Sequence, residues 1–155
     1  MLVSCHEDFL VRQVVLMVAV LALAGCFRGR AQRVTFVVPK GHAGPVWVVH
    51  DPTAPELVIE DGKYRAAFPA GGVLRVGTLR PFNHPEVTPA QYDDGTVLPY
   101  LMRGMAVAPE AVGLWSAWSG QTWPDQRDYI VWFAGTEAQF RAFAESGNHS
   151  PPAGK

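Results

Sequence analysis

The sequence predicts a mainly β protein, a small antiparallel sandwich-like domain with a short C-terminal helix. Three observations favour this class. Five short runs rich in β-branched or aromatic residues occur between residues 34 and 76, and turn sequences separate them. The 155 residues include 15 Gly and 13 Pro, which favours many turns over long helices. A helix-start signal occurs near the C-terminus, just after a continuous apolar run.

The first five predicted strands follow one another at intervals typical of a small β domain. Between the third and the fourth, the dipeptide Asp61-Gly62 matches the two-residue turn of a β-hairpin, because both central positions of that turn need positive φ. The strands are expected at 34–38, 46–49, 57–59, 64–68 and 73–76.

The middle of the chain gives a weaker pattern because proline recurs through it. The run 97–102 predicts a strand, and Pro99 would confine this strand to a sheet edge, since proline cannot donate to a β-ladder. Residues 109–118 fit two structures equally well. One is a short helix with Pro109 in its first turn, and the other is an alternating strand.

The C-terminal part is clearer. The apolar run 129–133 predicts a strand that is covered on both faces. Thr136 and Gln139 have the spacing of a capping box, which predicts a helix over 137–145. The remaining residues, 146–155, are mostly small and polar with two prolines, and they predict a flexible tail.

The N-terminal segment has the features of a lipoprotein signal peptide. Residues 14–24 are apolar and uncharged, but this run is shorter than the roughly 20 residues of a membrane-spanning helix. The sequence Leu23-Ala24-Gly25-Cys26 that ends the run resembles the lipobox of bacterial lipoproteins. The resemblance implies cleavage before Cys26 and attachment of a diacylglyceryl group to its thiol. The alternative is an uncleaved signal anchor that happens to contain a cysteine.

These features predict four segments. They are a signal peptide (1–25), a tether (26–33), the β-rich domain (34–145) and the flexible tail (146–155). A lipidated protein would lie in the cell envelope, bound to a membrane. The residue after Cys26 is Phe27 rather than Asp. In a Gram-negative host this resembles the default signal for transfer of a lipoprotein to the outer membrane, where it would lie on the periplasmic face. Cys5 falls in the cleaved part and Cys26 is acylated, so the mature chain would have no free thiol or disulfide.

The composition argues against a nucleic-acid-binding protein and against a disordered chain. The 13 Lys and Arg nearly balance the 14 Asp and Glu, so the net charge is −1. A nucleic-acid binder would show a strongly basic balance or a basic face, and we expect no such partner. The 48% hydrophobic content together with a low net charge argues against disorder.

Two short motifs resemble a group of small bacterial lipoprotein domains. Residues 36–46, FVVPKGHAGPV, match the opening F-x-[VI]-P-x-G-[YH]-x-G-x-V of these domains, which forms a strand, a turn and a second strand. Residues 133–137, FAGTE, with Phe140 following, resemble their closing strand-to-helix turn. The resemblance implies location and architecture only, because this group has no assigned activity.

No catalytic or metal site emerges from the spacing of polar residues. The four histidines outside the predicted signal peptide lack the short spacings of zinc ligands, so we expect no metal or other cofactor. The pairs Asp93-Asp94 and Glu60-Asp61 each precede a glycine, which is ordinary turn chemistry. His42 lies in a glycine-rich turn, where a structural hydrogen bond is expected. The four histidines are His42, His50, His84 and His149.

Tryptophan is concentrated in one segment. Four of the five Trp lie between 115 and 132. Trp132 is mid-strand and is expected in the core. Trp115, Trp118 and Trp123 have two interpretations: they fill the core of a domain without disulfides, or they form a binding surface for a sugar ring or a partner protein.

The functional hypothesis is a lipid-anchored, non-catalytic binding or accessory module of the cell envelope. Its partner would be another envelope protein or a cell-wall glycan. The alternative is a small envelope hydrolase or metal-dependent enzyme that uses His50, Asp51 or His84.

Overall fold

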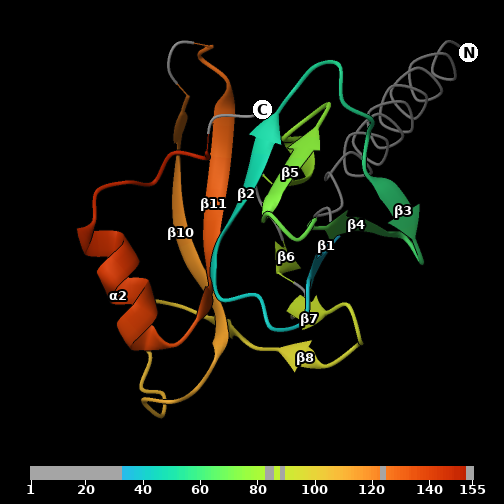
Figure 1. Ribbon diagram of the computed structural model, residues 1–155. Coiled ribbons are helices and arrows are strands. Elements are labelled where there is room, and N and C mark those ends of the chain that lie inside the picture. The colour runs from blue at the N-terminus through green and yellow to red at the C-terminus, as the bar shows by residue number, and fades with distance from the viewer. Residues whose placement is uncertain (1–32, 83–85, 88–89, 123–124, 153–155) are drawn as a thin grey trace, which may run out of the picture. The chain divides into compact units, whose positions relative to one another are not determined.

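The computed structural model describes residues 33–82, 86–87, 90–122 and 125–152 (Figure 1). The described part of the chain is mainly β, and its one α-helix lies near the C-terminal end, as predicted. A 3₁₀ turn, η1 (Arg80–Phe82), precedes β6, and α2 (Glu137–Glu145) follows the last strand. The strands are β1 (Arg33–Val38), β2 (Gly44–His50), β3 (Val58–Glu60), β4 (Lys63–Ala67), β5 (Val73–Val76), β6 (Glu86–Val87), β7 (Ala90–Tyr92), β8 (Val97–Leu98), β9 (Tyr100–Leu101), β10 (Gly113–Gln121) and β11 (Asp128–Gly135).

The strands form two sheets. The first has the order β3-β4-β1-β7-β8, with β6 also paired to β1, and the second has the order β5-β2-β11-β10-β9. Both sheets are mixed rather than antiparallel. In the first, β1 runs parallel to β4, β6 and β7, and in the second β2 runs parallel to β5 and β9 parallel to β10.

The parallel pairs arise because consecutive strands join different sheets. The chain leaves β1, turns at 39–43 and enters β2 in the other sheet, so these two neighbours in sequence do not pair. β4, β6 and β7 then return beside β1, and β5 returns beside β2, in the same direction, whereas β11 runs antiparallel to β2. The predicted hairpin is present between β3 and β4, and Asp61 and Gly62 both have positive φ, 51° and 73°.

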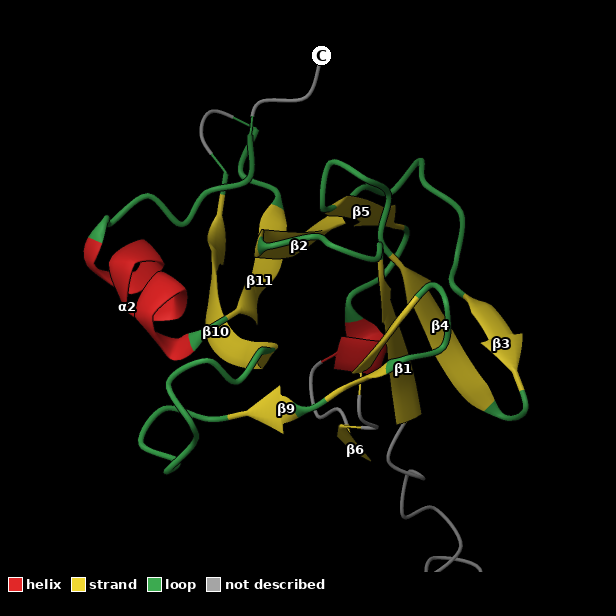
Figure 2. Cartoon of the chain, turned by 60° about the horizontal axis from the view of Figure 1, so that its bottom comes forward, coloured by secondary structure: helices red, strands yellow, loops and turns green. Residues whose placement is uncertain are grey.

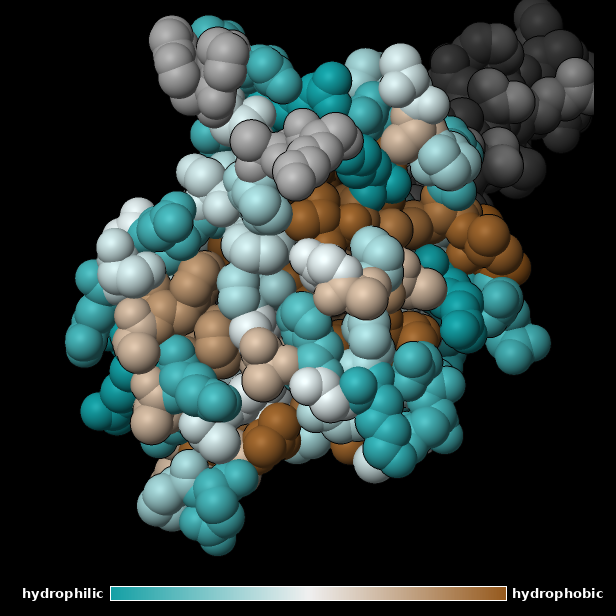
Figure 3. Space-filling view, in the orientation of Figure 1, coloured by the Kyte–Doolittle hydropathy of each residue, from teal (hydrophilic) through white to brown (hydrophobic). Residues whose placement is uncertain are grey.

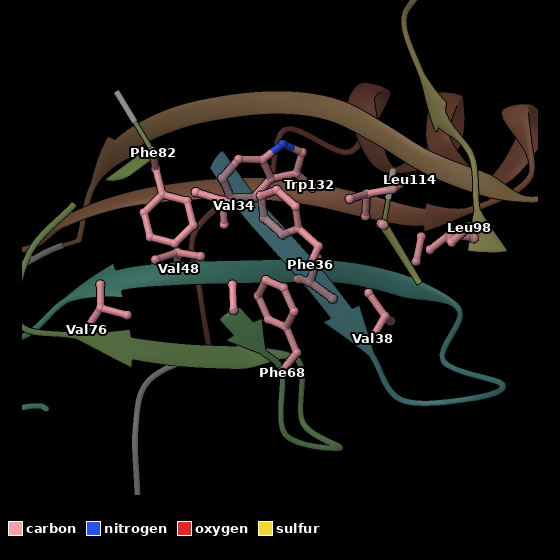
Figure 4. Packing of buried hydrophobic residues seen from close by; sticks show 14 residues of the cluster. Val34, Phe36, Val38, Val48, Phe68, Val76, Phe82, Leu98, Leu114 and Trp132 are labelled. Atoms are coloured by element: carbon pink, nitrogen blue, oxygen red, sulfur yellow. The ribbon is translucent and has the colours of Figure 1, made fainter. Parts of the chain in front are cut away.

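The main core fills the space between the two sheets (Figure 4). Phe36 of β1 is completely buried and lies beside Trp132 of β11, with their ring centroids 4.8 Å apart. The ring centroids of Phe68 and Phe82 each lie 6.1 Å from that of Phe36. Aromatic rings in such offset or tilted contacts join the layers at several points. Trp132 is therefore in the core, as predicted.

The outer face of the second sheet carries α2 (Figure 2). Because β11 has the main core on one side and α2 on the other, it is buried on both faces, as predicted. The capping box at the helix start is also confirmed. The Thr136 N–H donates to Gln139 Oε1 at 2.9 Å, and the Gln139 N–H donates to Thr136 Oγ1 at 3.4 Å.

The structure decides between the two alternatives for 109–118, because 113–121 forms the long strand β10. This strand pairs antiparallel with β11 over its whole length, and the register shifts between Ser116 and Trp118. A bulge of this kind inserts one extra residue into a strand and reverses the alternation of side chains beyond it. Trp115 and Trp118, three residues apart, therefore lie on the same face of the sheet.

The start of the predicted tail contacts the domain. The indole Nε1 of Trp47 donates to the carbonyl oxygen of His149 at 2.9 Å. The imidazole of His149 stacks on Trp118 with ring centroids 4.1 Å apart. These contacts place the first residues after α2 against the second sheet, whereas the sequence pattern suggested no such packing.

Candidate functional site

Trp115 belongs to the core rather than to the surface. Only 1% of it is exposed, and its ring stacks on Phe140 of α2 with centroids 5.1 Å apart. Its indole Nε1 donates to the carbonyl oxygen of Gly135 at 2.8 Å. Of the two alternatives for Trp115, core or binding surface, the structure places it in the core. Trp115 attaches α2 to the sheet and offers no surface to a ligand.

Trp118 is half-buried at the rim of the same layer. It contacts Phe140 and Phe143 of α2 as well as the stacked ring of His149. Aromatic contacts thus cover much of its surface, and its role in binding stays a prediction. Trp123, the third member of the predicted binding surface, lies outside the described residues.

A groove lies on the opposite face of β10 and β11, toward the first sheet. Its volume is about 760 Å³. The cross-strand pairs Ser116–Trp132 and Ser119–Ile130 place these four side chains on this face, since paired residues share a face. The pair Gln121–Asp128 continues the row toward the end of the hairpin. On the other side, the groove is bounded by Leu79, Phe82 and Tyr100.

The polar groups of the groove are mostly available for a ligand. Ser116 and Ser119 are exposed, and neither they nor Tyr100 makes a side-chain hydrogen bond to another described residue. Gln121 Nε2 donates to Asp128 Oδ1 at 2.9 Å, which leaves the second amide N–H and the second carboxylate oxygen unused. Concave sites with an apolar base and a few such polar groups are typical ligand sites.

The groove was not predicted from the sequence. Ser116 and Ser119 each follow a tryptophan in the segment 113–121, and no sequence motif marks them as ligand-binding residues. Tryptophan and serine recur here at an interval of three residues, and a regular strand would place Ser116 and Ser119 on opposite faces, so the sequence pattern gave no signal for a shared polar face. The bulge adds one residue between the two serines, so they share a face only in the folded strand.

The predicted alternative site at His50 and Asp51 is engaged in structural contacts. His50 Nε2 donates to the carbonyl oxygen of Gly77 at 3.2 Å. Asp51 Oδ2 lies 2.8 Å from Arg127 Nη1 and 3.6 Å from Arg75 Nη1. Both Thr53 donors, its backbone N–H and its hydroxyl, bond Asp51 Oδ1. Asp51 thus holds together the ends of three strands, β2, β5 and β11.

His84, the third residue of that alternative, lies outside the described residues. Among the residues that are described, no three His, Cys, Asp or Glu side chains are grouped closely enough to bind a metal ion.

The contacts of Asp51 predict an acid-dependent contribution to stability. Its pKa is lowered from 3.8, first by the hydrogen bonds from Thr53 and then by Arg127 and Arg75. Because the folded-state pKa lies below the unfolded-state value, the stabilisation is present above about pH 4 and is lost as the pH falls through the folded-state pKa. Asp51→Asn should therefore lower the free energy of unfolding at neutral pH, and the difference from wild type should shrink in acid.

Urea unfolding of both proteins at neutral pH and at several values below pH 4 measures this effect. Asp128→Asn is the matched control, because Asp128 is exposed and its side chain bonds only Gln121 among the described residues. A difference between wild type and Asp51→Asn that stays constant with pH would contradict the assigned role of the carboxylate.

The other polar motifs have the structural roles that were expected. His42 Nε2 donates to the carbonyl oxygen of Pro45 at 3.3 Å, within its turn. Asp94 accepts hydrogen bonds from Lys40 Nζ and from the Thr96 N–H, and these lower its pKa to about 2. Glu60 pairs with Arg65 across the β3–β4 hairpin at 3.3 Å.

The lipobox Leu23–Cys26 and its signal segment lie outside the described residues. In the part of the chain that is described, no helix has the length and apolar character needed to cross a membrane.

Comparison with known proteins identifies no family. No family model matches the chain, and no curated protein matches it. One similar solved structure is that of a Bacillus anthracis protein named as a candidate lipoprotein. It has 15% sequence identity and a TM-score of 0.47, over 80% of this chain and 84% of that chain. This similarity is too low to support a conclusion about function.

Proposed function

We propose that this chain is a lipid-anchored protein of the cell envelope that acts as a non-catalytic binding module, with the groove on β10 and β11 as its ligand site. The lipobox Leu23-Ala24-Gly25-Cys26 after an apolar segment supports the anchor. The unbonded hydroxyl groups over an apolar base support the binding role. In a Gram-negative host the periplasmic face of the outer membrane would be its location.

The rival enzyme hypothesis would use His50, Asp51 and His84. Both carboxylate oxygens of Asp51 are already bonded, Oδ1 by Thr53 and Oδ2 by Arg127, and this favours the binding module, because a general base or metal ligand needs a free oxygen aimed at its substrate or ion. A stoichiometric metal in the purified full chain, lost in His50→Ala, would support the enzyme instead.

The anchor is tested with Cys26→Ala. Wild type should partition with membranes and, by intact mass, carry acyl chains on a chain that begins at Cys26. Cys26→Ala should lose the acyl mass and remain unprocessed, because the thiol that accepts the diacylglyceryl group is absent. The expected loss of acylation is complete rather than partial.

Cys5→Ala is the matched control, because Cys5 is the other cysteine of the sequence and lies in the part removed by cleavage. This variant should behave like wild type in both measurements. Wild-type protein without acyl mass, or Cys26→Ala protein that still carries it, would contradict the proposed anchor.

A further inference from the structure

We infer that the groove on β10 and β11 takes a neutral, hydroxyl-rich carbohydrate chain; this inference rests on the binding role proposed above and names the ligand class of that site. Three properties of the groove lead to it: its charge, the kind of hydrogen-bonding groups it presents, and its apolar base.

The charge of the groove disfavours anionic ligands. Among the described residues that line it, Asp128 is the one charged side chain, and no Lys, Arg or His contributes. The nearby arginines, Arg75 and Arg127, bond Asp51 rather than entering the groove lining. A phosphate or carboxylate polymer would find no opposite charge here and would be repelled by Asp128. A neutral ligand meets no such barrier.

The hydrogen-bonding groups suit a ligand made of hydroxyls. The hydroxyl groups of Ser116, Ser119 and Tyr100 each donate one hydrogen bond and accept others. Sugar hydroxyls also donate and accept, so in a hydrogen bond between a protein hydroxyl and a sugar hydroxyl either group can be the donor. The bonded pair of Gln121 and Asp128 adds a donor and an acceptor that the pair itself does not use.

The base of the groove suits the carbon face of a sugar ring. Leu79, Ile130 and Tyr100 are half-buried, whereas Phe82 and Trp132 are only 3% and 5% exposed. The half-buried side chains provide apolar surface between the polar groups, and Phe82 and Trp132 add to the apolar lining. Apolar surface beside a few placed polar groups fixes a ligand's position and its orientation. A sugar ring, with polar edges and apolar faces, matches this pattern.

A peptide added as an extra strand is the main competing ligand. The groove side of the ribbon does not offer free backbone groups, because β10 and β11 pair with each other and β11 also pairs with β2. The outer edge of β10 is different: β9 pairs with it only at Leu114 and Trp115. A peptide would use that edge and the backbone, whereas a carbohydrate would use the side chains of the groove.

The test uses the full chain in detergent and isothermal titration with chitotetraose and cellotetraose, which are neutral. Tetragalacturonate serves as an anionic probe of similar length, and an uncharged extended peptide as the competing class. The key variant is Ser119→Ile, which removes a hydroxyl and fills the groove, and which suits a strand because isoleucine is β-branched. Ala67→Ile is the matched control, since Ala67 is an exposed strand residue outside the groove.

We expect saturable binding of at least one neutral oligosaccharide by wild type and by Ala67→Ile. Ser119→Ile should weaken that binding by about tenfold or more, equivalent to about 1.4 kcal/mol. Raising the salt concentration should leave the affinity unchanged, because screening acts on charged ligands.

Absence of binding to both neutral probes, or binding that Ser119→Ile leaves intact, would overturn the inference. A second result would also overturn the inference: wild type binds tetragalacturonate or the peptide, and Ser119→Ile abolishes that binding. This result would leave the proposed binding role of the groove in place. The proposed lipid anchor is tested separately, by the intact mass of wild type and of Cys26→Ala, so its failure can be distinguished from failure of the groove inference.

Discussion

Replacing Phe36 by alanine should lower the free energy of unfolding by about 3–5 kcal/mol. Phe36 is completely buried between the two sheets and contacts the rings of Phe68, Phe82 and Trp132. Removal of its ring loses the burial energy and leaves a cavity that the surrounding strands cannot fill. Since small domains are stable by about 5–15 kcal/mol, the variant should fold but unfold at much lower denaturant concentration.

Guanidinium unfolding followed by circular dichroism measures this loss. The control is Val58→Ala on the edge strand β3, where 64% of the valine is exposed, and hydrophobic surface is visible over this strand (Figure 3). Its effect should stay within about 0.5 kcal/mol. Equal effects of the two substitutions would show that Phe36 is not at the centre of the core.

Trp115→Ala should have an effect of similar size, about 3–5 kcal/mol. The substitution opens a cavity beneath α2, where Trp115 stacks on Phe140. It also leaves the carbonyl oxygen of Gly135 without its indole donor, and an unsatisfied buried acceptor adds to the loss. Because the outer layer depends on this contact, α2 should become the first part of the domain to lose protection from hydrogen exchange.

Trp115→Phe separates the two contributions, because it keeps an aromatic ring and removes the donor. Its loss should be smaller, about 1–3 kcal/mol. The oligosaccharide affinity of folded Trp115→Ala should match that of wild type, since Trp115 lies on the face of β10 opposite the groove. A stable Trp115→Ala variant that has lost ligand binding would show that Trp115 contacts the ligand.

Much of the fold could be predicted from local sequence patterns. The hairpin at Asp61-Gly62 and the helix that begins after Thr136 depend on residues only a few positions apart, so the sequence contains the whole signal. The strands predicted between residues 34 and 76 and at 129–133 are equally local, because most of them are short runs of β-branched and aromatic residues. The position of Trp132 in the core followed from an apolar run that had to be covered on both sides.

The arrangement of the strands could not be predicted in the same way. β1 and β2 have the pattern of a hairpin pair, yet they belong to different sheets, and the parallel pairs follow from that separation. Which strands pair, and whether they run parallel or antiparallel, depends on contacts between segments far apart in sequence. The same limit applies to 109–118, where pairing with β11 favours the strand over the helix.

Neighbouring residues alone were enough to predict the lipobox, the positions of most strands, the hairpin and the helix. Which polar and aromatic residues face a groove depended on how distant parts of the chain pack together. The bulge in β10 turns Trp115 and Trp118 toward α2 and leaves Ser116 and Ser119 on the opposite face, beside side chains from η1 and β9. Local patterns miss such a site because one inserted residue reverses the alternation of a strand, and because a groove exists only where distant segments meet.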